Sequence, residues 1–276
     1  MPASGQLRRM TPVLMALILA ACGGGGSSPP APPPPPQPPA GSTIMPEQTP
    51  APGAMQVQMP FLNRPFTGDY PLGNYMDHDR PEGPRVASGG YQLTWRGQHA
   101  IPCSSAAGRR PCVGYDSHTG YDWALPENTP LLAMADGDVL TAGLGAASAC
   151  VLMNEEVNAP LIVRIGYRAP NGETYTSAYV HLNRVDVAVG QRVTAGQQIG
   201  LSGVTGCVGF SAPGVKYAHL HLDVGRAANT NNGQLSYTDP YGWAGPGEDP
   251  YKTNPDGTET FWLWNPNQAP SLVPAP

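Results

Sequence analysis

Histidine and aspartate residues cluster in two short motifs of this 276-residue chain. The first is His118-Thr-Gly-Tyr-Asp122, where the glycine would let the backbone bend so that both polar side chains face one point. The second is His219-Leu220-His221, whose two imidazoles project from the same face if the segment is a strand. Imidazole nitrogen and carboxylate oxygen are ordinary zinc ligands at about 2.0–2.2 Å. Together the motifs predict a metal site, because an imidazole is costly to bury without a partner.

Each motif also has a simpler interpretation. A histidine four residues before an aspartate can be an ordinary surface pair, and His219 and His221 could both face solvent on an edge strand. A third motif, Tyr179-Val180-His181-Leu182, contains one histidine, and a single histidine in a strand is more often structural than catalytic. By strand alternation, Tyr179 and His181 are expected to share one face.

In their order along the chain, HxxxD, YxHL and HLH resemble the motifs of the M23 (LytM/lysostaphin-type) zinc metallopeptidases of bacterial cell walls. The resemblance extends over roughly Gly114–Arg226 and includes the segments GYDWALPENTPLLAMADGDV, VGQRVTAGQQIGLSGVTG and AHLHLDV. It departs from the family between Gly206 and His219, where a short Gly/Ser-rich stretch is usual and this chain is longer. Because that stretch should border the active cleft, substrate preference is in doubt.

The resemblance implies the role of each motif residue. His118, Asp122 and His221 match the three zinc ligands, and His181 and His219 match the two catalytic histidines. The implied cofactor is one Zn²⁺ per chain, with its fourth position left for water. The implied activity is that of a zinc metalloendopeptidase, which uses zinc-activated water to hydrolyse peptidoglycan cross-links or stem peptides.

Two residues are candidates for the substrate cleft, namely Tyr179 and Phe210. The bond cut is left open, since a D-amino-acid cross-link and a glycine bridge both fall within the family's range. The alternative function is a catalytically inactive LytM-like activator or scaffold for a cell-wall amidase. Such relatives typically lack ligands or catalytic histidines, and all five are present here. A biotinyl or lipoyl carrier needs a lysine at a hairpin tip, which Lys216 and Lys252 do not provide.

The surrounding sequence predicts an all-β fold, because short β-branched runs alternate with Gly and Asp turns and no long 3.6-residue apolar period occurs. Strands are expected at 131–133, 138–141, 161–167, 175–182, 192–194 and 219–224. We expect a compact antiparallel sheet-and-hairpin domain with Gly-rich loops around a cleft. Residues 114–228 would form the peptidase core.

Two further segments flank this core. Residues 58–113 are expected to be a lead-in segment that packs on it, and residues 229–276 an irregular tail with aromatic residues. The tail aromatics, Tyr241, Trp243, Trp262 and Trp264, are expected to pack in the core rather than line a substrate groove. The lead-in residues Met76-Asp77-His78-Asp79 predict a solvated turn, although they could also cover the cleft as a latency element.

The N-terminal region predicts export. Arg8 and Arg9 precede the apolar run Val13–Ala21, which is too short for a membrane-spanning helix of about 20 residues and is typical of a signal peptide over residues 1–21. Cys22 follows small residues, as in the bacterial lipobox, and is the expected lipidation site that anchors the protein to a membrane; an ordinary cleaved signal is the alternative. Residues 22–57 are a Gly/Pro-rich, disordered linker by composition. Gly23 favours the outer membrane, facing the periplasm, if the host has two membranes.

The net charge and the number of cysteines fit an exported protein. The net charge is −5, and removing Arg8 and Arg9 with the signal peptide takes it to −7, which argues against a nucleic-acid partner. Of five cysteines, removing Cys22 leaves an even number for two disulfides. These are Cys103, Cys112, Cys150 and Cys207. Three pairings are permitted, and we favour 103–112, which closes a short loop, with 150–207. No CxxC spacing supports a cysteine-ligated zinc site.

Overall fold

The computed structural model describes residues 53, 55–61, 71–79, 86–87, 92–100, 114–115, 118–147, 149–150, 155–156, 158–226, 236–253, 260–266, 268–270 and 273–274. The predicted signal peptide, Cys22 and nearly all of the linker lie outside these residues, as do Cys103 and Cys112. Within the described part, no helix is both long enough and apolar enough to cross a membrane.

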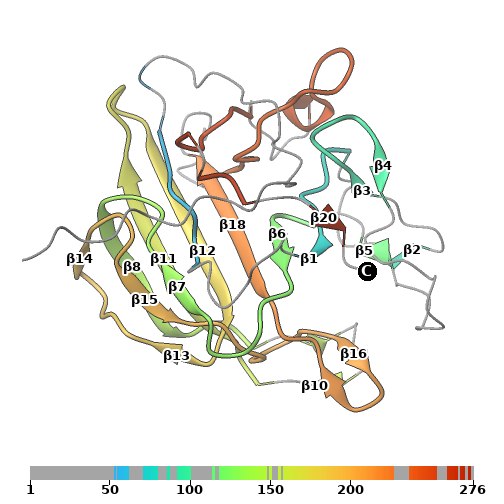
Figure 1. Cartoon of the computed structure of the whole chain (residues 1–276), viewed down its shortest axis with the longest axis vertical. Coiled ribbons are helices and arrows are strands. Elements are labelled where there is room, and N and C mark those ends of the chain that lie inside the picture. The colour runs from blue at the N-terminus through green and yellow to red at the C-terminus, as the bar shows by residue number, and fades with distance from the viewer. Residues whose placement is uncertain are drawn as a thin grey trace, which may run out of the picture. The chain divides into compact units, whose positions relative to one another are not determined.

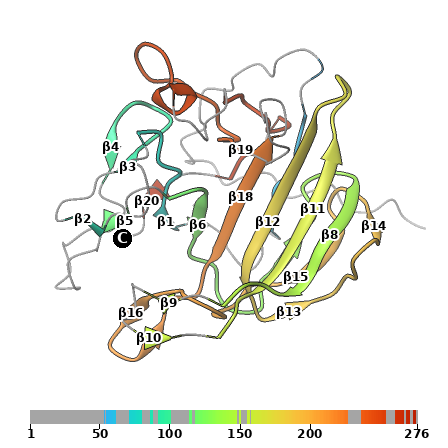
Figure 2. The ribbon, with the colours of Figure 1, turned by 180° about the vertical axis from the view of Figure 1, so that it is seen from behind.

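The largest sheet in the described part of the chain has nine strands. Along the sheet they run in the order β14-β8-β11-β12-β18-β6-β1-β20, with β19 paired to β18 (Figures 1 and 2). Their bounds are β14 Arg192–Val193, β8 Gly137–Leu144, β11 Leu161–Arg168, β12 Thr174–Leu182, β18 Leu220–Arg226, β6 Tyr121–Trp123, β1 Pro71–Asn74, β20 Val273–Pro274 and β19 Ser236–Tyr237. Neighbouring strands are antiparallel, except that β1 and β20 pair in parallel. The all-β, antiparallel prediction is confirmed.

A smaller sheet contains β13 (Arg184–Val185), β15 (Gln198–Leu201) and β7 (Pro130–Leu132). Its side chains Leu131 and Ile199 join one apolar cluster with Val163 and Ile165 of β11, so the two sheets share a core. The described short elements are β2 (Val86–Ala87) with β5 (Gly114–Tyr115), β3 (Gln92–Leu93) with β4 (His99–Ala100), β9 (Ala149–Cys150) with β10 (Glu155–Glu156), β16 (Phe210–Ala212) with β17 (Val215–Lys216), and the 3₁₀ turn η2 (Pro250–Thr253).

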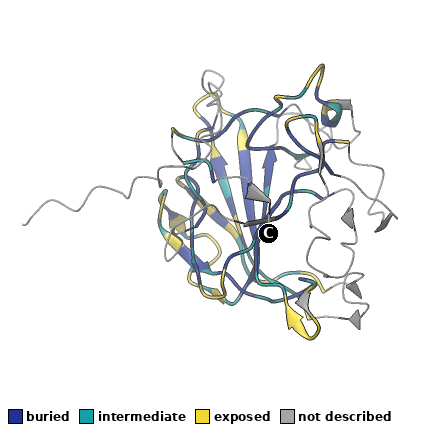
Figure 3. Cartoon of the chain, turned by 45° about the vertical axis from the view of Figure 1, so that its right-hand side comes forward, coloured by how far each residue is buried: buried dark blue, intermediate teal, exposed yellow. Residues whose placement is uncertain are grey.

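The expected strands appear close to their expected positions. The segment 161–167 is the central strand β11, which pairs with β8 on one side and β12 on the other. Along β11, Val163 and Ile165 are buried while Arg164 is exposed, which is the alternation of a strand with one face against the core. In Figure 3, dark blue marks the buried residues along the strands of the main sheet.

The lead-in segment and the tail complete this core. β1 belongs to the main sheet through its pairing with β6. In the tail, Tyr241 and Trp264 are fully buried, and Tyr241 packs 5.1 Å from Tyr121 of β6, measured between ring centroids. Val57 forms a β-bridge with Trp264, which places the end of the linker beside the tail. The expected core packing of the tail aromatics is found for Tyr241, Trp262 and Trp264, whereas Trp243 is only partly buried.

The prediction of a solvated turn at Met76–Asp79 is right about the turn, which lies at His78 and Asp79, and wrong about its exposure to solvent. Met76, Asp77 and His78 are all 0% exposed, and only Asp79 lies at the surface. Local composition suggested a turn because two acids flank a histidine. Residues far away in the chain supply the hydrogen-bond partners that stabilise these buried polar side chains, as described below.

Candidate metal centre

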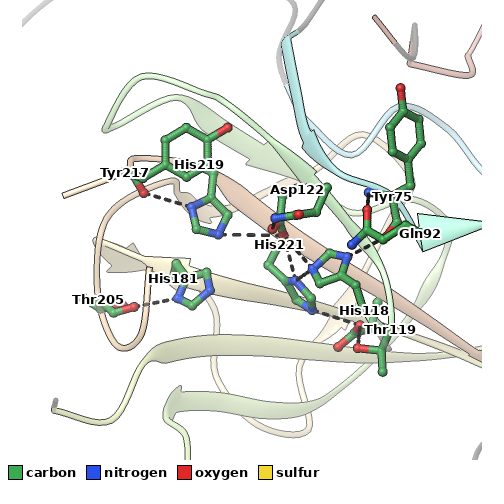
Figure 4. Close-up of polar contacts among 12 residues, drawn as sticks. Tyr75, Gln92, His118, Thr119, Asp122, His181, Thr205, Tyr217, His219 and His221 are labelled. Carbon is green, nitrogen blue, oxygen red and sulfur yellow. Dashed lines mark hydrogen bonds and ion pairs between the residues drawn. The ribbon is translucent and has the colours of Figure 1, made fainter. Parts of the chain in front are cut away.

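Three polar side chains converge at the junction of β6 and β18 (Figure 4). His118 lies just before β6, Asp122 is within it, and His221 lies directly opposite Asp122 in the antiparallel register with β18. His118 Nε2 is 3.1 Å from His221 Nδ1 and 3.2 Å from Asp122 Oδ1, and the last two atoms are 2.8 Å apart. The predicted ligand set is therefore brought together at one point.

The spacing of these atoms fits a zinc ion. Ligand atoms about 2.0–2.2 Å from a shared tetrahedral centre lie roughly 3.3 Å from one another. The observed separations of 2.8–3.2 Å are close to that value, and Asp122 is nearly buried. Two nitrogens and one oxygen are also a donor set that zinc favours, and three protein ligands are the number found in catalytic sites.

The second nitrogen of each ligand imidazole is held by a fixed acceptor. His118 Nδ1 donates to the carbonyl oxygen of Tyr75 over 2.8 Å, and His221 Nε2 donates to Asp223 Oδ1 over 2.9 Å. Such partners set the tautomer and the orientation of a ligating ring. Each ring therefore turns its other nitrogen, Nε2 of His118 and Nδ1 of His221, toward Asp122.

The carboxylate ligand has a partner of its own. Asn74, at the end of β1, donates from Nδ2 to Asp122 Oδ2 over 2.7 Å, which leaves Oδ1 directed at the imidazoles. Thr119 donates to Asp223 Oδ1 and so fixes the acceptor of His221. The arrangement has the layered hydrogen bonding expected around a protein metal ligand.

The charges of the centre stabilise one another. Burial alone would raise the pKa of Asp122, but the neighbouring His118 and His219 and the hydrogen bonds to His118 and His221 hold it well below its usual range. Burial would lower the pKa of His221, yet Asp223 and Asp122 raise it well above its usual value. The pKa of Asp223 is lowered, chiefly by His221 acting against burial. The centre thus favours ionised carboxylates, the form that binds metal.

Two further histidines flank the centre. His181 Nδ1 donates to the carbonyl oxygen of Thr205 over 2.7 Å, and His219 Nδ1 donates to that of Tyr217 over 2.9 Å. Their ring centroids are 4.6 Å apart, and His219 Nε2 is 3.8 Å from Asp122 Oδ1. The ring of Tyr217 stacks on His219 with centroids 4.9 Å apart. Both rings therefore carry the proton on Nδ1 when neutral, which makes Nε2 the basic atom.

Both flanking histidines favour the neutral form. Burial, followed by the nearby His219 and His221, lowers the pKa of His181 to about 3. Burial also lowers the pKa of His219, although Asp122 acts in the opposite direction. Two neutral imidazoles beside a metal centre can accept a proton from water and return it.

His181 reaches the centre through a break in strand alternation. Leu182 pairs with Leu161 and Val180 pairs with Ile162, so His181 is the extra residue of a β-bulge between β12 and β11. Its φ of 70° lies in the left-handed region, which is uncommon for a residue with a side chain. Bulges re-aim side chains next to active sites, and this one turns His181 to the face that carries His221.

The same break makes the prediction for Tyr179 wrong. Tyr179 lies opposite Leu222, a core residue, and is 0% exposed. Its hydroxyl donates to the carbonyl oxygen of Leu132 and accepts from the backbone N–H of Met134. Tyr179 therefore faces the core between the two sheets and lines no cleft. Simple alternation put it beside His181 because it assumed a regular strand.

Gly120 lies at a bend, as predicted, and it also allows a close approach to β18. A Cβ built there would lie 2.1 Å from the carbonyl oxygen of Leu222 and 2.8 Å from Asp223 Oδ1, and the φ of Gly120 is outside the left-handed region. The missing side chain lets the turn before β6 pack directly against β18. This contact contributes to the short distance between Asp122 and His221.

Phe210 lies on the β16–β17 hairpin and is 44% exposed. The hairpin adjoins the site, because the N–H of Tyr217 donates to the carbonyl oxygen of Gly209 and Tyr217 stacks on His219. Contact with substrate at Phe210 stays a prediction. Cys207 is disulfide-bonded, but the side chain of Cys150 lies outside the described residues, so the 150–207 pairing also stays a prediction.

Several residues of the site were not found from the sequence. Asp223 had a usable signal, since it stands two residues after His221 and must share its face in a strand. Asn74 and Tyr75 had none, because they are more than 40 residues from the side chains they contact. Thr205 and Tyr217 act through backbone carbonyls, which any residue type supplies.

Comparison with known proteins shows which proteins the region around this centre resembles. Residues 116–234 match the model described as Peptidase family M23. The "Peptidoglycan DD-endopeptidase ShyA" of Vibrio cholerae is 34% identical over 115 residues, which cover 41% of this chain and 22% of that protein. The "Glycyl-glycine endopeptidase ALE-1" of Staphylococcus capitis is 31% identical over 119 residues, or 42% of this chain and 26% of that protein. The chain thus spans about a quarter of the length of these relatives, or less.

Among solved structures, the catalytic domain of lysostaphin from Staphylococcus simulans is 26% identical. The match covers 47% of this chain and 78% of that chain, with a TM-score of 0.32.

Proposed function

Because the chain carries a domain of peptidase family M23, we propose that it is a zinc-dependent endopeptidase that hydrolyses peptide bonds of peptidoglycan. The observation that carries the proposal is the convergence of His118 Nε2, Asp122 Oδ1 and His221 Nδ1 within 3.2 Å of one another. Two neutral imidazoles with basic Nε2 atoms lie beside these atoms. Such groups can transfer protons during hydrolysis, whereas a site that only stores metal does not need them.

His118, Asp122 and His221 would hold the zinc ion. Zinc in such a site supplies a Lewis acid that polarises a peptide carbonyl and acidifies water. Asn74, Tyr75 and Asp223 keep the ligand atoms oriented through the hydrogen bonds described above.

His181 and His219 carry the proton chemistry. Each presents Nε2, so each can orient the attacking water and accept its proton. The imidazolium that results can donate a hydrogen bond to the tetrahedral oxyanion or a proton to the leaving amine. The two rings lie at similar depth, with exposed fractions of 8% and 4%, so the division of these roles between them is left open.

The substrate proposal rests on the relatives. Their names describe a peptidoglycan DD-endopeptidase and a glycyl-glycine endopeptidase, which are named for different peptide bonds. We therefore propose the peptide part of peptidoglycan as the substrate class. A D-amino-acid cross-link and a glycine bridge are the two alternatives for the bond.

The test uses the purified full chain and sacculi of both cross-link chemistries. We expect about one zinc per chain by elemental analysis, and soluble peptide fragments whose masses identify the bond. A chelator should abolish fragment release, and added zinc should restore it. His118→Ala provides the matched variant, because it removes a ligand and leaves both flanking histidines in place.

The competing function is activation of a wall amidase by an inactive relative. It would be indicated by a protein that takes up zinc and releases no peptide from any wall type, yet raises the activity of an added amidase. The presence of His181 and His219 in a proton-accepting arrangement favours the enzyme instead.

We also propose that the protein is exported and anchored by a lipid on Cys22, at the outer membrane facing the periplasm in a host with two membranes. Support comes from the apolar run before Cys22, the Gly/Pro-rich stretch after it and the absence of an acid at position 23. Metabolic labelling with an alkyne fatty acid should tag the wild-type chain and leave Cys22→Ser unlabelled. Membrane fractionation would then identify the membrane.

A further inference from the structure

A second cluster of charged side chains is buried away from the metal centre. His78 is 0% exposed and lies between two carboxylates, with Nε2 2.8 Å from Asp239 Oδ2 and Nδ1 2.8 Å from Asp249 Oδ1. The rings of Trp243 and Tyr251 flank His78 at centroid distances of 5.1 and 6.1 Å. We call His78, Asp239 and Asp249 the latch.

Each carboxylate of the latch is fixed by further donors. Asp239 Oδ2 accepts from the hydroxyl of Tyr121 over 2.6 Å, and its Oδ1 accepts from the N–H of Tyr241 over 2.7 Å. Asp249 Oδ2 accepts from the hydroxyl of Thr260 over 2.6 Å. The latch therefore joins three parts of the chain: the lead-in segment, strand β6 and the tail.

The latch is connected to His118 through the four residues 75–78. The carbonyl oxygen of Tyr75 accepts from His118 Nδ1, and the N–H of Asp77 donates to the carbonyl oxygen of His118 over 3.0 Å. On its other side, the N–H of His78 donates to the carbonyl oxygen of Leu93 over 2.9 Å. The segment that orients the first ligand thus ends at the residue that the latch fixes.

The latch is also connected to Asp122. Tyr121, whose hydroxyl donates to Asp239, precedes Asp122 in β6, and its ring points to the opposite face of the strand. Asp239 of the tail therefore contacts Tyr121, which is next to Asp122. It also contacts His78, which ends the segment that orients His118.

A buried ionic cluster is a poor means of gaining stability alone. Desolvation of the charges offsets most of their attraction, and apolar residues of the same volume often serve as well or better. What such a cluster does provide is a defined geometry, since its charges tolerate few alternative arrangements. Because the cluster contacts the segments that carry or orient His118 and Asp122, its defined geometry can position those two side chains.

We propose that His78, Asp239 and Asp249 are positioning residues of the zinc site, which fix residues 75–78 and β6 so that His118 Nε2 and Asp122 Oδ1 converge. The inference rests on the proposed function, because it takes His118 and Asp122 to be zinc ligands. None of the three latch residues touches the zinc-binding atoms.

The test compares His78→Gln and Asp249→Asn with a control that breaks a partly buried ion pair elsewhere in the fold. In the control, Arg226→Gln removes the partner of Glu173, whose Oε1 is 2.6 Å from Arg226 Nη2. Arg226 is at the far end of β18 from His221, and it also contacts the tail, through the ring of Phe261. Zinc dissociation constants are measured on the metal-free full chain with a competing chelator, and thermal unfolding is followed in parallel.

We expect both latch variants to weaken zinc binding by about tenfold or more, and Arg226→Gln to change it by less than about twofold at a similar loss of thermal stability. Equal zinc affinity in the latch variants and the control would overturn the proposal, since the latch would then stabilise the fold and nothing else. If His78→Gln does not fold, Asp249→Asn decides, because it keeps the histidine and replaces the carboxylate with a carboxamide of nearly the same shape.

A readout without zinc separates this inference from the proposed function. In the metal-free wild type, ¹⁵N NMR of the histidine rings should show His118 as the Nδ1–H tautomer, hydrogen-bonded to Tyr75. Loss of that tautomer signal in the latch variants supports a positioning role for the latch, even if the wild type binds no zinc. Failure of the wild type to bind zinc would contradict the proposed function and leave the positioning of His118 standing. An unchanged signature in a folded latch variant would overturn the inference.

Discussion

Each histidine of the metal centre has one ring nitrogen committed to a fixed acceptor. The acceptors are backbone carbonyls for His118, His181 and His219, and the Asp223 carboxylate for His221. These hydrogen bonds decide which nitrogen faces the candidate zinc site. The chemistry of the site is therefore set by neighbours whose own side chains are mostly unimportant, and this is why the sequence identified the histidines but not the atoms that orient them.

Substitutions at His181 can separate the role of its backbone conformation from the role of its imidazole ring. Asparagine tolerates the left-handed φ of 70° better than alanine does, so His181→Asn should keep the β-bulge and unfold at a higher temperature than His181→Ala. Both variants should retain zinc, since the three ligands are untouched. Both should lose peptide release by roughly 10²–10⁴-fold, the usual contribution of a general base. Peptide release comparable to wild type in His181→Asn would show that the ring has no catalytic role.

The buried His78 predicts a pH dependence of stability. Burial would lower its pKa, but hydrogen bonds to Asp239 and Asp249 raise the pKa to about 9 from an ordinary 6.5. Folding therefore favours the protonated ring, so this contribution is complete below about pH 6.5 and is lost as the pH rises through about 9. A difference of this size corresponds to about 3 kcal/mol.

Urea unfolding at pH values from 6 to 10 measures the effect. The free energy of unfolding should fall more steeply for the wild type than for His78→Gln between about pH 6.5 and 9. The difference between the two free energies should therefore narrow across that range and stay constant above it. Parallel curves would mean that His78 does not change protonation between the folded and unfolded states in this range.

At the scale of the elements, alternation and turn composition were enough to predict the long central strands, but not β1, β15, β19 or β20. The segments 161–167 and 175–182 became β11 and β12 with nearly the expected bounds, because apolar side chains recur on the face that meets the smaller sheet. The bulge at His181 was beyond that pattern, since a single extra residue leaves no compositional mark when it is not a glycine. The error at Tyr179 followed directly from this.

The contact between Gly120 and β18 can be tested by adding one methyl group. Gly120→Ala would place Cβ 2.1 Å from the carbonyl oxygen of Leu222, so the turn must move away from β18. We expect a loss of about 1–3 kcal/mol in the free energy of unfolding, and weaker zinc binding because Asp122 and His221 separate. Gly145→Ala is the control, since its Cβ would meet no atom closer than 3.4 Å. If both variants unfold at the same temperature, the close approach at Gly120 is not required.

At the scale of the whole molecule, the centre depends on segments that no local pattern could have joined. Asn74 and Tyr75 reach the ligands from the lead-in segment, while Tyr241 and Trp264 cover the core face of β6 from the tail. Such long-range partners are set by tertiary packing, which periodicity and motif spacing do not encode. The sequence therefore predicted strands within residues 114–228 and treated the two flanking segments as accessories, although both supply partners of the centre.

Whether the core depends on the tail can be tested by ending the chain at residue 234, where the family match ends. The truncation removes Tyr241, Trp262 and Trp264, whose exposed fractions in the full chain are 0%, 5% and 0%. At about 150–250 Å² for each aromatic ring and about 25 cal/mol per Å², their burial corresponds to roughly 11–19 kcal/mol. Ordering the tail offsets part of this, but a typical domain is stable by only about 5–15 kcal/mol.

The truncated chain is therefore expected to lack a cooperative thermal transition and to bind a hydrophobic dye, whereas the full chain should unfold cooperatively. Near-ultraviolet circular dichroism and dye fluorescence measure both properties. The rings left without cover would be those of Trp95 and Tyr121, which pack against Tyr241. Tyr121 also precedes Asp122 in β6. A truncated chain that unfolds at the wild-type temperature would mean that the core is autonomous. Because the tail supplies both the cover of β6 and the carboxylates that fix His78, we expect instead that zinc binding and folding are lost together.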